Sequence, residues 1–265
     1  MNIVSAVGNR IIHSFYSAGY TLNMLFESFY WLQKVGKRFR SIMTQFYICG
    51  VQSIPVTLIV GVFTGMILSF QTGIVFKDYH LEEYLGLVVL VSMCKEVGPF
   101  MTAFILAGRV GSAMAAELGT MKVSEEIDAL EVMSINPVDF LVMPRVIALA
   151  LIAPILTAYA NFLGVIGGAV VARYQIGVDY TIYFNNVINY MSLTDLTLIF
   201  GGLVKAFVFG IIIAIVGCSN GLRAENGAEG VGTSARKTVV DAFLLILMFN
   251  YFMSSIIEKT FGSLG

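Results

Sequence analysis

Five long apolar runs divide the sequence, and each is long enough to cross a lipid bilayer as one helix. A helix needs about 20 mainly apolar residues to span a hydrocarbon core of about 30 Å. The runs cover residues 47–73, 85–113, 142–172, 196–221 and 238–257. Only 12% of the residues are charged and the mean hydropathy is +0.83, whereas soluble domains carry about 25% charged residues. The sequence therefore predicts an all-α integral membrane protein.

Residues 11–32 precede the first run and differ from it in character. They are rich in Phe, Tyr and Trp, are interrupted by His13, Asn23 and Glu27, and lead into the basic segment KVGKRFR. The stretch is too long for the apolar region of a cleavable signal peptide. This pattern favours a helix lying in the membrane interface, with its basic end near anionic head groups. A sixth span is the alternative, and it would move residue 1 to the other side of the membrane.

No linker or change of composition divides the chain, so we expect residues 1–265 to form a single domain. Within it, residues 1–46 are the N-terminal interfacial segment and residues 47–265 the transmembrane bundle. The loop at 173–195 contains YTIYFNNVINYM, whose apolar residues recur at helical spacing. This pattern predicts a short helix on the outer surface.

The positions of Lys and Arg predict the orientation, because basic residues in short loops are retained in the cytoplasm. Eleven fall on the N-terminal side of the membrane: Arg10, Lys34, Lys37, Arg38, Arg40, Arg109, Lys122, Arg145, Arg223, Arg236 and Lys237. Three fall on the other side: Lys77, Arg173 and Lys259. With five spans, the N-terminus is expected in the cytoplasm and the C-terminus outside.

Two adjacent charges, Lys95 and Glu96, interrupt the second run, and Lys205 interrupts the fourth. A charge at mid-membrane costs about 3 kcal/mol even on lenient insertion scales. Lys95 lies about eleven residues from Tyr84 and Lys205 lies about ten from Asp195, at the outer ends of the two spans, which predicts a cross-helix pair between Glu96 and Lys205. Adjacent helical positions differ by about 100°, so Lys95 must face elsewhere. The pair either fixes helix register or acts on a substrate path.

The first run combines flexible apolar side chains with glycines in GVFTGMILSFQTGIVF. Met66, Phe70 and Gln71 suit a wide, shape-tolerant pocket of the kind that a lipid tail requires. Ordinary helix packing is the alternative role for each of them.

Small residues and prolines punctuate the runs. Gly61 and Gly65, and likewise Gly164 and Gly168, have the four-residue spacing that lets membrane helices approach closely. Proline inside a helix removes an amide donor, so the carbonyl that it frees needs another partner. Pro99 lies in this position within the second run.

The segment 117–137, ELGTMKVSEEIDALEVMSINP, gathers five of the 17 acidic residues into one stretch between the second and third runs. We expect Ser124 to cap a helix of about three turns that ends at Asn136-Pro137. Val123, Ile127 and Leu130 share one face of it. Acidic charge cannot attract anionic lipid, so an amphipathic acidic helix here predicts a protein partner. Its candidate contact residues are Glu117, Lys122, Glu125, Glu126, Asp128 and Glu131.

The sequence offers no site for chemistry of its own. Cys49, Cys94 and Cys218 lack the paired spacing of a disulfide framework or zinc site. The glycine-rich segment GVGTSARKT, 230–238, has Arg236 where a phosphate-binding loop needs glycine before its lysine. We therefore expect no catalytic residue, metal or cofactor on this chain, and no nucleic acid as partner.

Two segments resemble the MlaE permease family, the membrane subunit of the Mla ABC system for phospholipid asymmetry. They are KEVGPFMTAFILAGRVGSAMAAELGTMKVSEEIDALEVMSINPVDFLVMPR, 95–145, and GTSARKTVVDAF, 232–243. The resemblance implies a homodimeric permease in the bacterial inner membrane that moves glycerophospholipids between that membrane and the periplasm. Lys95 stands where many relatives have Arg, and Ser134 replaces a common Gly after the acidic helix.

The same resemblance implies the partners. They are cytoplasmic ATPase subunits that hold ATP and Mg, a periplasmic MCE-domain ring protein and a small STAS-domain protein. Residues 122–131 would form the coupling helix that docks on the ATPase, and Lys95 and Glu96 would lie near the lipid path. A self-contained ion- or proton-coupled carrier that uses Glu96 and Lys205 as its relay is the alternative.

Overall fold

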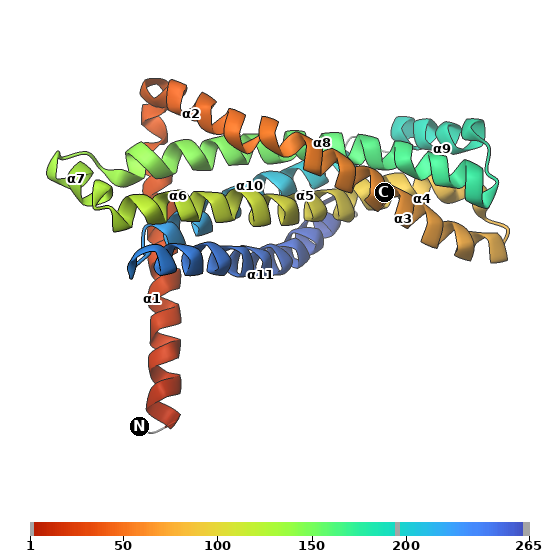
Figure 1. Ribbon diagram of the computed structural model, residues 1–265. Helices are drawn as coiled ribbons and strands as arrows, with labels where there is room; N and C mark the ends of the chain where they lie inside the picture. Colours follow the sequence, from red (N-terminus) through yellow and green to blue (C-terminus); the bar gives the residue numbers. More distant parts are fainter. Residues whose placement is uncertain (1–2, 194–196, 262–265) are drawn as a thin grey trace.

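The computed structural model describes residues 3–193 and 197–261, and every regular element in these residues is helical. The N-terminal part forms α1 (Ile3–Tyr30), α2 (Val35–Cys49) and α3 (Ile54–Asp78), with 3-10 turns at Trp31–Lys34 and Val51–Ser53. Figure 1 shows α1 crossing the end of the bundle roughly at right angles to the long helices. This arrangement fits a helix that lies in the interface better than a sixth span.

The second predicted span is one continuous helical run with two π-helical segments. It comprises α4 (Leu85–Ser92), a π segment (Met93–Val97), α5 (Gly98–Leu106), a second π segment (Ala107–Gly111) and α6 (Ser112–Val123). The rest of the chain forms α7 (Glu126–Val132), a π segment (Val138–Val142), α8 (Met143–Val171), a π segment (Ala172–Ile176), α9 (Tyr180–Leu193), α10 (Thr197–Gly221) and α11 (Gly227–Phe261).

Five of the described helical segments are long and apolar enough to cross a membrane, which confirms the predicted number of spans. The helices extend beyond the apolar runs, and α11 begins at Gly227 instead of residue 238. Residue 196, where the fourth span was predicted to begin, lies outside the described residues. Arg109 and Arg145, predicted in loops, therefore lie inside helices. Apolar composition marks only the hydrocarbon layer, whereas backbone hydrogen bonding continues a helix past it.

The centre of the bundle is α8, which packs against α2, α3 and α10. Helix α8 lies between these elements in Figure 1. The α3–α8 contact is made by the two predicted glycine pairs. A Cβ atom on Gly65 would lie 1.9 Å from the carbonyl oxygen of Gly164, and one on Gly61 would lie 2.9 Å from the Cα of Ala160. The predicted small-residue packing is confirmed within one chain.

The predicted surface helix is present as α9, packed beside α4. Its Tyr183 is fully buried and donates a hydrogen bond to the carbonyl of Val165 in α8, at 3.1 Å. One aromatic anchor therefore attaches α9 to the central helix.

The acidic helix α7 is shorter than predicted, with seven residues. Ser124 does not cap it, because its hydroxyl donates to the carbonyl of Thr120 in α6. The helix ends at Val132, before Asn136-Pro137. Its end is a Schellman motif, in which Ser134 adopts a left-handed φ of 60° and the amide of Ile135 donates to the carbonyl of Leu130 at 2.9 Å.

Replacing Ser134 with glycine should stabilise the end of α7 by about 0.5–1 kcal/mol, because glycine adopts left-handed φ without steric cost. Hydrogen exchange of the peptide covering 126–135 should become slower. Ser112→Gly, where the second π segment continues into α6, is the matched control and should destabilise this helical run by a similar amount. Faster exchange in the Ser134→Gly peptide would contradict this account of the helix end.

Candidate functional site

A cluster of polar side chains lies where the first π segment meets α10 and α11. Lys205 of α10 is 1% exposed, and its ammonium donates to the Glu96 carboxylate at 2.7 Å. It also donates to Ser254 Oγ of α11 at 2.7 Å. Asn250, one helical turn from Ser254, donates to the second oxygen of Glu96 at 3.1 Å. The predicted pair between Glu96 and Lys205 is therefore present, inside a network of three helices.

Two local features place Lys205 at this point. Pro99 has no amide proton, so it cannot donate to the carbonyl of Lys95 four residues earlier. Lys205 Nζ donates to that freed carbonyl at 3.0 Å. Gly202 brings the helices together, because a Cβ there would lie 1.9 Å from the carbonyl oxygen of Cys94. The side chain three residues later on α10 is thereby aimed at the π segment.

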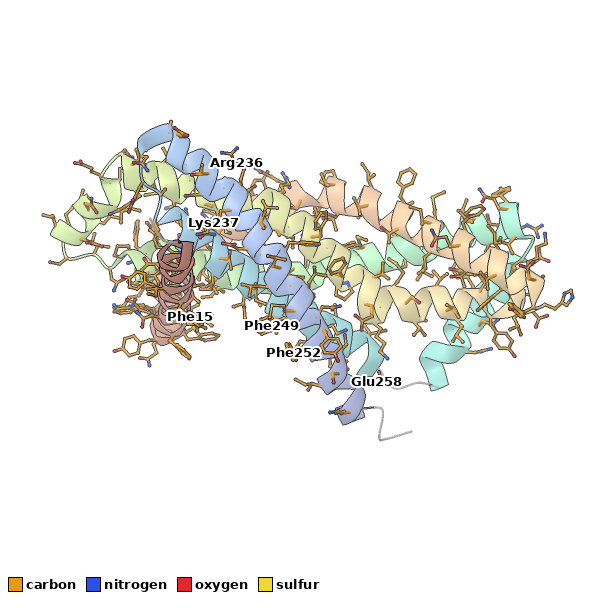
Figure 2. All side chains as sticks on the ribbon, turned by 90° about the horizontal axis from the view of Figure 1, so that it is seen from below. Phe15, Arg236, Lys237, Phe249, Phe252 and Glu258 are labelled. Carbon is orange, nitrogen blue, oxygen red and sulfur yellow. The ribbon has the colours of Figure 1, made fainter. Side chains whose placement is uncertain are left out.

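Lys95 points away from this cluster, as expected for adjacent helical positions. Its ammonium forms an ion pair with Glu258 near the end of α11, and both side chains are partly exposed. Glu258 is labelled at that end of α11 in Figure 2. The second span is therefore linked to α11 by both Glu96 and Lys95.

The three candidate pocket residues of α3 lie apart from the cluster, which is built by the π segment, α10 and α11. Met66 packs against α8, where a Cβ on Gly167 would lie 3.2 Å from its Cγ. Phe70 and Gln71 are exposed on the surface of the single chain. One chain therefore does not bring the predicted pocket residues and the predicted charges into a single cavity, and their role in a lipid path stays a prediction.

The acidic residues of 117–137 are all exposed, but two of them pair with basic side chains. Glu117 is not part of α7: it lies on α6 and forms an ion pair with the buried Arg145 of α8 at 2.8 Å. Lys122, at the end of α6, pairs with Asp128 of α7 at 2.6 Å. Glu117 and Asp128 therefore act as structural links, because each pairs with a basic side chain of a neighbouring helix.

Two of the three residues on the predicted apolar face are turned inward, while Val123, the last residue of α6, is 38% exposed. Ile127 is 3% exposed in the core, and Leu130 packs against that core. The residues left exposed are mostly acidic or lie at the end of the helix: Glu125, Glu126, Asp128, Ala129, Glu131, Val132 and Met133. A partner of α7 would therefore meet acidic side chains and an apolar tip, not the predicted apolar stripe.

Sequence reasoning missed the buried Asp139, which follows α7. Its carboxylate accepts a hydrogen bond from Arg38 of α2 at 3.1 Å and lies 3.9 Å from Lys34. The basic segment after α1 is thus partly engaged by the protein itself instead of by lipid. The single acid at the start of an apolar run was the signal available, but only the packing of α2 supplies its partners.

The family model of the permease MlaE matches residues 42–256. The chain belongs to the MlaE permease family. A probable ABC transporter permease protein of Synechocystis sp. is 42% identical over 215 residues, 81% of each chain. One from Rickettsia typhi is 36% identical over 259 residues, 98% of this chain and 99% of the relative.

A relative from Haemophilus influenzae is named intermembrane phospholipid transport system permease protein MlaE. It is 32% identical over 257 residues, 97% of each chain. Membership of the MlaE family makes this chain a multi-pass membrane protein and an ABC transporter permease, a subunit that is not itself catalytic. This favours the permease hypothesis over the self-contained carrier. In the described residues, no three His, Cys, Asp or Glu side chains are grouped to hold a metal ion.

Proposed function

We propose that this chain is the permease subunit of an ABC transporter that moves glycerophospholipids between the inner membrane and the periplasm. Such transport would contribute to the lipid asymmetry of the outer membrane. The observation that carries the proposal is the similarity, over 97% of the chain, to a relative named for intermembrane phospholipid transport. The cytoplasmic N-terminus and periplasmic C-terminus predicted from the basic residues are part of the proposal.

The proposed assembly contains two copies of this chain. Its partners are cytoplasmic ATPase subunits that bind ATP and Mg, a periplasmic MCE-domain ring protein and a small STAS-domain protein. Large apolar side chains on α3 and α11 support the dimer, because the single chain leaves Phe63, Phe70 and Phe252 exposed. At an interface between two copies, the exposed Phe70 and Gln71 of each copy would line one lipid path.

We propose that the second span carries the conformational change from the ATPase to the charged network. ATP binding on the partner would move α7, which is fastened to α6 by the pair of Lys122 with Asp128. Helix α6 is continuous through α5 with the segment that carries Glu96. The two π segments of this run are places where a helix can bend. A displacement at α7 would therefore reach the network of Glu96 and Lys205.

Reversing two charges on α7 tests this coupling. In a variant with Asp128→Lys and Glu131→Lys, we expect the ATPase subunit to be lost from the purified complex. The exposed acidic surface becomes basic, and truncating or reversing paired charges at an interface typically weakens binding by 2 kcal/mol or more, about 30-fold. The measurement is the amount of ATPase that co-purifies with the tagged permease.

The matched control reverses two exposed acids at the opposite end of the bundle, Asp78→Lys with Glu83→Lys. That variant should retain the ATPase. Equal loss in both variants would mean that the charge reversal acts on folding. Full retention in the α7 variant, or transport driven by a pH gradient without nucleotide, would contradict the proposed coupling.

A further inference from the structure

A cavity of about 530 Å³ lies between α1, α10 and α11, within the range of small-ligand pockets. Each helix contributes one face, with Leu22 and Leu25 from α1, Ile212 and Ile215 from α10, and Leu245 and Phe249 from α11 among the lining residues. None of the cluster around Glu96 and Lys205 lines it. The cavity is therefore a second site, separate from the charged network.

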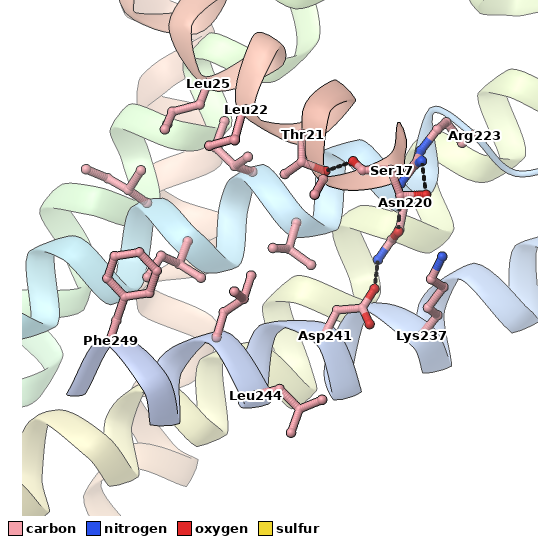
Figure 3. A pocket seen from close by; sticks show the side chains of 16 residues that line it. Ser17, Thr21, Leu22, Leu25, Asn220, Arg223, Lys237, Asp241, Leu244 and Phe249 are labelled. Carbon is pink, nitrogen blue, oxygen red and sulfur yellow. Dashed lines mark hydrogen bonds between the residues drawn. The ribbon is translucent and has the colours of Figure 1, made fainter. Parts of the chain in front are cut away.

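The lining changes from apolar to polar along the cavity. Figure 3 shows Leu22, Leu25 and Phe249 toward one end, and Ser17, Asn220, Arg223, Asp241 and Lys237 gathered at the other. Helices α1, α10 and α11 each supply both classes of side chain. The polar end lies where α10 ends, beside residues 237–241 of α11. A ligand that fits this gradient has a polar head and an apolar tail.

The charges at the polar end differ in how firmly they are held. Arg223 donates to Ser17 Oγ at 2.8 Å and to the carbonyl of Ser219 at 3.2 Å, and its guanidinium lies 5.1 Å from the ring of Tyr20. Lys237 has no ion-pair or hydrogen-bond partner in the described part of the chain. Asp241 accepts one bond, from Asn220 at 3.1 Å. A fixed guanidinium and an unpaired ammonium are the groups that hold a phosphate.

We propose that this cavity binds one membrane phospholipid, separate from the lipid being transported. Its phosphate lies between Arg223 and Lys237, and an acyl chain lies between α10 and α11. For a phosphatidylethanolamine, the carboxylate of Asp241 complements the ammonium of the head group. The lipid then fastens α1 to the bundle, because α1 forms one wall of its site.

A lipid fits this site better than a second copy of the chain does. Helix α1 leaves Phe15, Tyr16 and Phe26 exposed beside the cavity, as expected for a helix in contact with lipid. The polar groups lie at one end only, beside Ser17 of α1 (Figure 3). A protein surface would have to bring an anion to Lys237 and an apolar segment beside it at the same time.

The test uses the full chain in nanodiscs of phosphatidylethanolamine and phosphatidylglycerol, with a phosphatidylethanolamine that carries a photoreactive diazirine in one acyl chain. Cross-linked peptides are mapped by mass spectrometry. We expect cross-links to 211–216 of α10 and 244–249 of α11. Lys237→Ala should lower their yield about tenfold at limiting lipid, since a charge-assisted hydrogen bond to phosphate is lost. Ile215→Trp, which fills the cavity, should abolish them.

Arg236→Ala is the matched control, because Arg236 is adjacent and exposed but does not line the cavity. Figure 2 shows Lys237 beside α1 and Arg236 directed away from it. The control should leave the yield unchanged. Lys237 is exposed, so its variant tests the proposal even if Ile215→Trp fails to fold. Equal yields in the Lys237→Ala and Arg236→Ala variants would overturn the proposal, as would disulfide formation between two copies of a Leu245→Cys variant.

Discussion

Replacing Gly65 with alanine should separate α3 from α8 and destabilise the protein by about 3 kcal/mol or more. The added Cβ would lie 1.9 Å from the carbonyl oxygen of Gly164 and 2.5 Å from its Cα. Both atoms belong to backbone in the middle of a long helix, so no side-chain rotation relieves the overlap. The helices must move apart, and the dispersion contacts along this interface are lost with them. Thermal unfolding of the purified protein in detergent measures the effect.

Gly108→Ala is the matched control for this prediction. Gly108 lies in a helical segment too, but a Cβ there would meet nothing within 4 Å. Alanine at such a position should stabilise the helix by about 0.5–1 kcal/mol, through its lower backbone entropy in the unfolded chain. The two glycine-to-alanine changes are therefore expected to have opposite signs. A small effect at Gly65 would contradict the close approach of α3 and α8.

Replacing Lys205 with methionine should cost about 3–5 kcal/mol, because it leaves the Glu96 carboxylate without its cation. Methionine keeps most of the side-chain volume, so the loss is electrostatic. The carbonyl of Lys95, which cannot accept a bond from Pro99, loses the bond from Lys205 as well. Unfolding in detergent gives the stability, and lipid transfer by the reconstituted complex gives the function.

A second substitution separates the structural role from the functional one. Adding Glu96→Gln to the Lys205→Met variant removes the unpaired charge, so much of the lost stability should return. If the network acts in transport, the restored double variant should still fail to transfer lipid. Normal transport in a stable Glu96→Gln variant, alone or in the double variant, would mean that the pair only fixes helix register.

Several features followed from the sequence because they depend on local chemistry or on length. Five apolar runs predicted five spans, since the thickness of the membrane sets the length of a crossing helix. The equal depth of Glu96 and Lys205 predicted their pairing, because an unpaired charge in the hydrocarbon layer is costly and opposite charges at one depth can pair. Glycine spacing predicted close helix approach, although the partner of each pair came only from the structure.

The acidic segment shows where sequence reasoning failed. Helical periodicity identified the apolar face of α7 correctly, but it could not say what covers that face. The structure buries Ile127 against the chain's own core. Glu117, grouped with α7 by proximity in sequence, belongs to α6 and pairs with Arg145, 28 residues later (145 − 117). Long-range partners of this kind are set by packing.

The sequence by itself determined that this chain is a helical membrane protein with five spans, a distinct N-terminal segment before them and an acidic segment between the second and third. These properties depend on hydrophobicity and spacing, which are local. Only the tertiary structure decided which helices meet and that Lys205 donates to the Lys95 carbonyl, to which Pro99 cannot donate. It alone decided that α1, α10 and α11 enclose a cavity with one polar end. Each of these depends on side chains distant in sequence being brought within a few ångströms, and only the packed bundle does that.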